Sequence, residues 1–257
     1  AMVIMLRVSW NLSTKRKFWL SRCSLELNRI KGQMARPLDP EIYQAQSTDK
    51  LVSTLSSESR AFSKDYLHWP LVLVVLTESS VQRLQLILSQ ILGEKEAGLK
   101  IREWMGKGLH TVTLEMQHEY EAACRKPELK AYFLAKYGHR GPGELDLINP
   151  RWNELKDQAF KPGINSIKTN EKSSEAVLQE IASLKSFKRE IVLEEWQLLQ
   201  QMLELREQWK MEILKPYAQI RVVLEVLKDR LNSGPDIHWL RLSEVESLAS
   251  NPNEISR

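Results

Sequence analysis

The chain has 257 residues, and its 37 Lys and Arg against 33 Asp and Glu give a formal net charge of +4. The charge is uneven, because residues 1–36 carry +7 and the remaining residues carry −3. This distribution argues against a nucleic-acid-binding domain with cations spread over its fold. Only 10 glycines favour a helical protein over sheet folds, which need many tight turns.

Cysteine content and hydrophobicity suggest a compartment. Two cysteines, Cys23 and Cys124, are too few for a disulfide framework or a four-cysteine zinc site, so a reduced, cytoplasmic setting is expected. The longest apolar run covers residues 71–76, whereas a membrane-spanning helix needs about 20 apolar residues. We therefore expect no membrane-spanning helix.

The N-terminal region is expected to form a basic leader or linker over residues 1–40, partly extended. It has no clear helical stripe, and residues 3–10 are compatible with a short strand. A poorly ordered leader, a targeting peptide, and contact with a membrane or a nucleic acid all remain open for it. Pro37 and Pro40 disfavour helix continuation, so we place a helical domain at 41–250 and a tail at 251–257.

The next part of the chain shows helical periodicity. Leu51, Leu55, Phe62 and Tyr66 have spacings compatible with one helix face, which Pro70 is expected to end or kink. A further stripe predicts a helix that ends at Gly93. Its members are Val81, Leu84, Leu88, Ile91 and Leu92. Short helices are predicted at 99–106, 113–123 and 128–136, a loop at 138–152 and a polar connection at 153–171.

The last third carries the clearest pattern, a set of apolar residues at spacing near 3.5 within residues 171–232. Its members are Leu198, Met202, Leu205, Trp209, Ile213, Ile220, Leu224, Leu227 and Leu231. The pattern predicts a long antiparallel hairpin arm or two collinear helices, interrupted at Pro216. A coiled-coil dimer stays open as an alternative. Residues 237–242 are expected to be extended, with a final helical turn at 244–248. The predicted fold is mainly α, an irregular multi-helix bundle with a long C-terminal helical hairpin and a glycine-rich loop.

That loop, residues 137–152, combines three glycines within six residues with an imidazole, two guanidiniums and two carboxylates. Glycines allow close backbone approach, and arginine forks bind carboxylate or phosphate. The loop is therefore either a ligand site or a structural element. In the second case Arg140 or Arg151 pairs with Glu144 or Asp146 and pins helices together.

The loop sequence resembles a loop in the central helical domain of phosphoenolpyruvate synthase-like proteins, a group that includes the rifampin phosphotransferases. The matching positions are Gly138, His139, Arg140, Gly141, Gly143, Glu144, Asp146, Pro150, Arg151 and Trp152. Weaker similarity flanks the loop, at residues 108–116 upstream and at 205–207, Tyr217, Arg221 and 236–240 downstream. The resemblance extends over roughly residues 45–250.

The resemblance implies one part of a phosphotransferase of the kinase or dikinase type. In that family an ATP-grasp domain takes phosphate from ATP, a swivelling domain carries it on a histidine, and the helical domain holds the acceptor. This chain has no glycine-rich nucleotide loop and no phosphohistidine motif. We therefore expect a substrate-binding domain that is not catalytic alone and holds no cofactor, with ATP and Mg needed only in the missing domains.

Expected partners are a small-molecule acceptor and the ATP-grasp and swivelling domains, in cis or in trans. A homodimer is possible, whereas nucleic acid and membrane are not expected as partners. The alternative function is that of a non-catalytic helical scaffold or protein–protein interaction domain.

The resemblance and the chemistry of the loop give its residues provisional roles. Arg140 and Arg151 would offset phosphoryl charge, while Glu144 or His139 would accept or position a hydroxyl proton. The substrate-binding set is Gly138, His139, Arg140, Gly141, Gly143, Glu144, Asp146, Arg151 and Trp152. No metal site is expected, since the Glu115-x-x-His118 spacing lacks the second such pair that a di-iron site requires.

Overall fold

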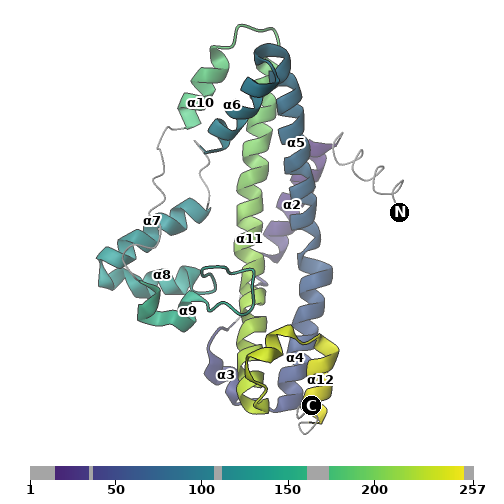
Figure 1. Ribbon diagram of the computed structural model, residues 1–257, viewed down its shortest axis with the longest axis vertical. Coiled ribbons are helices and arrows are strands. Elements are labelled where there is room, and N and C mark those ends of the chain that lie inside the picture. The colour runs from purple at the N-terminus through teal and green to yellow at the C-terminus, as the bar shows by residue number, and fades with distance from the viewer. Residues whose placement is uncertain (1–14, 35–36, 107–111, 161–173, 252–257) are drawn as a thin grey trace. The chain divides into compact units, whose positions relative to one another are not determined.

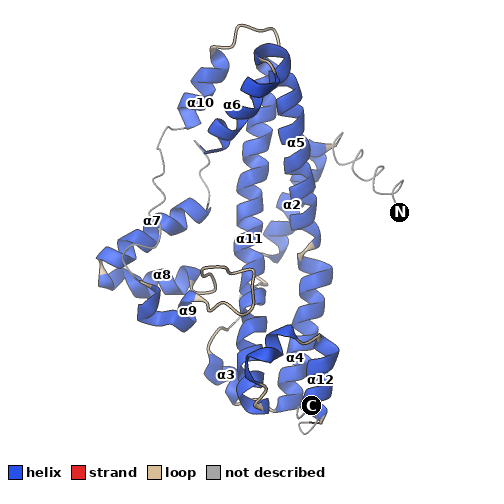
Figure 2. Ribbon diagram, viewed as in Figure 1, coloured by secondary structure: helices blue, strands red, loops and turns tan. Residues whose placement is uncertain are grey.

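The computed structural model describes residues 15–34, 37–106, 112–160 and 174–251. Within these ranges the chain forms helices joined by loops, with no strand, as Figure 2 shows. The predicted mainly α fold is thus confirmed. The strand predicted at residues 3–10 lies outside the described residues.

The chain divides into two compact units, each assembled from three stretches of sequence. Unit 1 comprises residues 1–29, 69–118 and 163–210, and unit 2 comprises residues 30–68, 119–162 and 211–257. The region predicted as one helical domain, residues 41–250, therefore contributes to both units. The glycine-rich loop belongs to unit 2.

The described residues of unit 1 include segments of six helices, which are labelled in Figure 1. They are α2 (Arg16–Ile30), α5 (His68–Leu92), α6 (Glu94–Gly106), the start of α7 (Val112–Arg125), α10 (Ser174–Ala182) and the first part of α11 (Arg189–Leu231). Trp104 and Trp196 meet edge to face in its core, with ring centroids 5.6 Å apart. Leu84 and Leu88 of the predicted stripe are fully buried in the same cluster. As predicted, α5 ends at Leu92, where Gly93 takes a φ of +86°.

Helix α2 is anchored to unit 1 by buried polar contacts, although it lies in the segment predicted as a leader. Arg16 is 8% exposed, and its Nη1 and Nη2 atoms donate to the two oxygens of the Glu195 carboxylate at 2.5 and 2.7 Å. The Trp209 indole donates to the Cys23 carbonyl at 3.1 Å. Cys23 is fully buried, and this burial raises the pKa of its thiol to about 12, which disfavours a nucleophilic thiolate.

The helical stretch Thr48–Leu92 has the length and apolar composition of a membrane span. A single stretch of this kind is weak evidence, because the core helix of a soluble protein meets the same criteria. About 33% of its most apolar window is buried in the structure. On α5, Leu71 is 60% exposed and Val74 is 50% exposed, so this helix presents apolar side chains at the surface.

Unit 2 contains short helices around the second part of α11. These are α3 (Pro40–Gln44), α4 (Thr48–Ala61), a π-helical turn η1 (Phe62–Tyr66), η2 (Pro127–Leu129), α8 (Lys130–Tyr137), α9 (Trp152–Leu155), η3 (Lys156–Ala159), η4 (Gly234–Trp239) and α12 (Leu242–Ser250). Leu51 and Leu55 of the predicted α4 face are buried against Val223 and Leu227 of α11. Apolar burial of this kind is the main stabilising contribution in both units.

Two predictions about the C-terminal third were wrong. Helix α11 runs without interruption through Pro216 instead of breaking there. Proline inside a helix costs about 3 kcal/mol, yet Leu214 before it and Ala218 after it are both 1% exposed, so apolar packing outweighs that cost. The segment predicted to be extended, 237–242, begins instead within the 3-10 helix η4, and the extended backbone follows at Leu240 and Arg241.

Candidate functional site

The glycine-rich loop connects α8 to α9 and folds back on itself. The backbone N–H of Trp152 donates to the Arg140 carbonyl at 2.8 Å, and that of Asn153 donates to the Gly138 carbonyl at 3.0 Å. These bonds bring the two ends of the loop together. Tyr217 of α11 adds a bond from its hydroxyl to the Leu145 carbonyl, at 2.8 Å.

The glycines of the loop serve this close packing. A Cβ at Gly138 would collide with Asn153 Oδ1 and with the Leu134 carbonyl oxygen, and one at Gly141 would lie 2.7 Å from the Pro150 carbonyl oxygen. Gly143 has a φ of +64°, which side chains with a Cβ rarely adopt. The three glycines therefore have structural reasons to be present, whether or not a ligand binds.

We expect Gly138→Ala to lower the free energy of unfolding by about 1–3 kcal/mol, because the added methyl overpacks the end of the loop. Chemical denaturation followed by circular dichroism measures this change. Gly98→Ala is the matched control, since its Cβ would lie 4.0 Å from Gln85 and its site is helical. It should stabilise the chain by about 0.5–1 kcal/mol. Equal effects of the two substitutions would contradict the steric argument.

Arg140 and Glu144 form a buried pair within the loop. Arg140 is 2% exposed, and its Nε and Nη2 atoms donate to the two Glu144 oxygens at 2.5 and 2.7 Å. The Gly141 backbone N–H also donates to Glu144, at 3.4 Å. This is the pairing anticipated by the structural interpretation of the loop. In this arrangement both carboxylate oxygens of Glu144 are engaged, which leaves it poorly suited to accept a substrate proton.

His139 lies beside this pair and is 5% exposed. Its Nε2 atom is 3.1 Å from the Met211 carbonyl oxygen. Burial, together with the charges of Arg140 and Lys215, lowers the pKa of His139 to about 3. The imidazole is therefore neutral at pH 7, with its Nε2–H donating to the carbonyl. So low a pKa makes His139 a weak proton acceptor.

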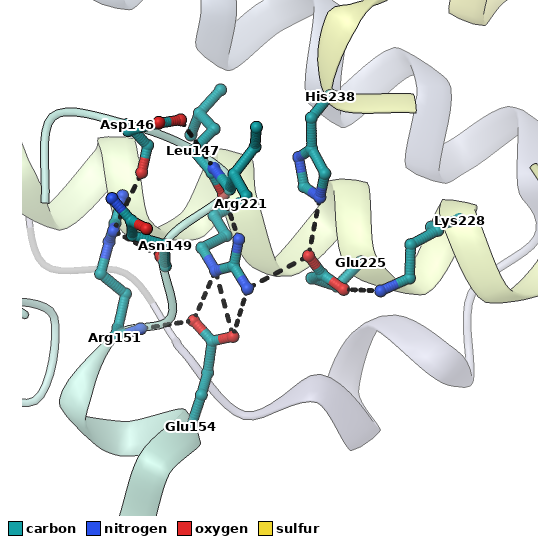
Figure 3. Close-up of polar contacts among 10 residues, drawn as sticks. Asp146, Leu147, Asn149, Arg151, Glu154, Arg221, Glu225, Lys228 and His238 are labelled. Atoms are coloured by element: carbon teal, nitrogen blue, oxygen red, sulfur yellow. Dashed lines mark hydrogen bonds and ion pairs between the residues drawn. The ribbon is translucent and has the colours of Figure 1, made fainter. Parts of the chain in front are cut away.

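Arg151 sits at the end of the loop and is 1% exposed. Its Nη1 atom donates to the carbonyl oxygens of Asn149 and Asp146, at 2.8 and 3.3 Å (Figure 3). The Tyr217 ring centroid is 5.8 Å from the guanidinium carbon, within the range of a cation–π contact. The Nε and Nη2 atoms are buried and have no hydrogen-bond partner among the residues that the structure describes. Burial, and after it the charge of Arg221, lowers the pKa of Arg151.

A polar network adjoins Arg151 and ties the loop to α11. Arg221 binds both oxygens of Glu154 at 2.8–3.1 Å, donates to the Leu147 carbonyl and pairs with Glu225 at 3.1 Å (Figure 3). Glu225 also contacts Lys228 and His238. The net effect of desolvation and these cations is a lowered pKa for Glu225.

Sequence reasoning placed Arg221 only among the weaker similarities and did not single out Glu154. The available signal for Glu154 was its place three residues after Arg151, at the start of a helix. Its Oε1 atom accepts the Arg151 backbone N–H at 3.0 Å, as in a capping box.

The remaining predicted residues have different surroundings. Trp152 stacks on Tyr120 with ring centroids 5.7 Å apart and contacts Phe133 at 4.9 Å. It therefore belongs to an aromatic cluster of unit 2. Asp146 is exposed, and its carboxylate accepts the backbone N–H of Ile148 at 3.0 Å.

Residues 128–211 match the family model described as rifampicin phosphotransferase fourth domain. The predicted resemblance to a rifampin phosphotransferase-like helical domain is thereby confirmed. No curated protein and no solved structure matched the chain.

The matched segment contains α8, the whole glycine-rich loop and α9, and it ends within α11. It is shorter than the predicted resemblance over residues 45–250. Every predicted substrate-binding residue lies inside it. Tyr217 and Arg221, which contact the loop from α11, lie just beyond it.

Two further features of the described residues bear on possible binding sites, the arrangement of metal-binding side chains and a surface groove. Within the ranges that the structure describes, no group of three or more His, Cys, Asp and Glu side chains is arranged to hold a metal ion. A groove of about 400 Å³ lies between α4 and α12 of unit 2 and includes Ser56, Arg60 and Glu246. Ser56 donates to Glu246 at 2.5 Å. None of the loop residues lines this groove.

Proposed function

We propose that the chain is the acceptor-substrate-binding helical domain of an ATP-dependent phosphotransferase of the phosphoenolpyruvate synthase or rifampin phosphotransferase type. ATP and Mg would act in ATP-grasp and swivelling phosphohistidine domains, supplied in cis or in trans. The chain would then bind the acceptor in the cytoplasm without transferring phosphate alone. Phosphoryl transfer depends mainly on positioning and charge, so a separate acceptor domain is chemically reasonable.

The observation that carries this proposal is the position of the loop inside the matched segment. The match covers residues 128–211, and the loop within it is fixed by the Arg140–Glu144 pair and by the Arg151 contacts to main-chain carbonyls. A binding loop fixed by buried contacts loses little conformational freedom when a ligand arrives.

Reconstitution in trans would test the proposal. The chain is mixed with the ATP-grasp and swivelling domains of a rifampin phosphotransferase, labelled ATP and either rifampicin or pyruvate. Labelled phosphate on the acceptor only when all components are present would support the proposal. The control omits the chain. If the chain neither enables transfer nor is thermally stabilised by ansamycins, pyruvate-like acids or nucleotides, the proposal is wrong.

The exposed apolar residues of α5 favour the alternative, a non-catalytic interaction domain. Leu71, Val74 and Leu86 are 60%, 50% and 65% exposed, and exposed apolar patches often mark protein interfaces. This alternative expects an oligomer whose mass depends on concentration, together with indifference to every small molecule in the screen. Light scattering at several protein concentrations distinguishes the two functions.

A further inference from the structure

The guanidinium of Arg151 has one edge that is satisfied and one that is not. Nη1 donates to two loop carbonyls, whereas Nε and Nη2 are buried and find no hydrogen-bond partner in the described ranges of the chain. The Nε and Nη2 hydrogens point in nearly the same direction. They therefore form the side-on fork with which arginine binds both oxygens of a carboxylate or phosphate.

The neighbouring cations in unit 2 already have carboxylate partners. Arg140 is bound to Glu144, and Arg221 is bound to Glu154 and Glu225. Arg151 forms no ion pair in the part of the chain that the structure describes, and its side chain donates to main-chain oxygens. The Glu154 carboxylate accepts a hydrogen bond from the Arg151 backbone N–H, but it forms its ion pair with the Arg221 guanidinium. The loop thus contains a buried guanidinium that no carboxylate of the described residues contacts directly, although the charges of Glu154 and Glu144 act on it at longer range.

A buried cation of this kind is energetically unfavourable unless something neutralises it. Removing a guanidinium from water carries a large desolvation penalty, and unpaired buried donors add to it. The contact with the Tyr217 ring offsets a part of this penalty but leaves Nε and Nη2 without acceptors. An oxyanion bound at this edge would supply both the missing charge and the missing acceptors.

We propose that the Nε–Nη2 edge of Arg151 binds an oxyanion, the carboxylate or phosphate group of a ligand. The inference rests on the proposed function only in treating the loop as the ligand-binding element. It also assigns this role to Arg151 alone, because the guanidinium of Arg140 already binds both oxygens of Glu144.

Access to this edge requires a movement, because both nitrogen atoms are enclosed. Tyr217 covers the guanidinium and is only partly buried; among the described residues its hydroxyl donates to the carbonyl of the exposed Leu145, and its ring packs against Phe62 with centroids 5.0 Å apart. Displacement of its ring would uncover the guanidinium without breaking the Arg140–Glu144 pair. Tyr217→Phe, which removes the bond to Leu145, should therefore raise the oxyanion affinity or leave it unchanged.

The test follows the Nε–H resonance of Arg151 by NMR while inorganic phosphate, acetate or pyruvate is titrated into the full chain at constant ionic strength, with chloride as the reference. A new hydrogen bond should move this resonance downfield in a saturable manner. Phosphate acting more strongly than the carboxylates identifies a phosphoryl group as the ligand chemistry, and the reverse order identifies a carboxylate.

Arg151→Lys keeps the charge but loses the fork, so the affinity measured by titration calorimetry should weaken about tenfold or more. Arg125→Lys, on the exposed surface of α7, is the matched control and should bind as the parent does. An Arg151 Nε–H resonance that is indifferent to all three anions overturns the inference, and this readout needs no variant to fold. The NMR titration uses the chain without any phosphotransferase domain. A negative titration can therefore be distinguished from a failure of the reconstitution experiment.

Discussion

Replacing Arg140 with alanine is expected to lower the free energy of unfolding by about 3–5 kcal/mol. The substitution leaves the Glu144 carboxylate, in a residue only 8% exposed, without the two charge-assisted bonds that it accepts in the native loop. Glu144→Ala should cost a similar amount, because it leaves the guanidinium buried and unpaired. Urea denaturation monitored by circular dichroism measures both changes.

Two controls show whether the loss of unfolding free energy in Arg140→Ala arises because the Arg140–Glu144 pair is buried. Glu121 and Arg125 also form an i,i+4 pair, but the Arg125 side chain is 77% exposed, so breaking that pair should cost only about 0–1 kcal/mol. The double substitution Arg140→Met with Glu144→Leu removes both charges and should be less destabilising than either single alanine variant. A loss below about 1 kcal/mol for Arg140→Ala would contradict the structural role.

This result would affect how the proposed function is tested. A lost activity in Arg140→Ala would otherwise be taken as evidence of catalysis, although loss of the folded loop predicts the same result. Activity should therefore be compared with the folded fraction of each variant. Arg151→Lys is the better probe of ligand binding, because the Arg151 side chain binds no carboxylate of the described residues and the lysine retains its charge.

Local patterns predicted much of the fold. The stripe before Gly93 specified α5 and its end, because apolar spacing and a C-terminal glycine are both short-range signals. The Arg140–Glu144 pair was one of several pairings open from the sequence, and its four-residue separation is compatible with local contact.

Long-range contacts account for most of what the sequence did not predict. Leu20, Cys23 and Leu27 of α2 are buried at helical spacing, but exposed Phe18 before them and exposed Leu25 between them mask the stripe. The continuity of α11 through Pro216 depends on burial of its flanking residues, which a local proline rule does not contain. Similarly, Arg151 lacks an anion because Arg221 binds Glu154 from 67 positions away in the chain.

The stability of the chain should fall as the pH is lowered from 7 to 4.5, and His139 should account for about 2–3 kcal/mol of the loss. Its pKa is lowered from 6.5 to about 3 in the folded chain, mainly by burial and secondarily by the charges of Arg140 and Lys215. In the unfolded chain the imidazole takes up a proton below its normal pKa, while the folded chain keeps it neutral. The unfolded state therefore binds more protons, and acid favours unfolding by up to about 1.4 kcal/mol per pH unit.

Urea denaturation at intervals between pH 4.5 and 7 measures this slope. The lower limit is chosen because Glu180 and Glu225 have lowered pKa values, so their stabilising contributions are lost only at more acidic pH. His139→Gln keeps a donor for the Met211 carbonyl but does not titrate, and it should reduce the pH dependence of stability over this range. An unchanged slope would place the acid sensitivity in other groups.

The imidazole can also be observed directly, which separates its titration from any effect of substitution on packing. The Cε1–H resonance of His139 should stay at its neutral position down to about pH 4, because protonation would place a second cation beside Arg140 in a buried loop. A midpoint near 6.5 would show that water reaches His139. Such access would also weaken the argument that the Arg140–Glu144 pair is shielded, because His139 borders it. The imidazole thus reports on whether the loop is as closed in solution as its contacts imply.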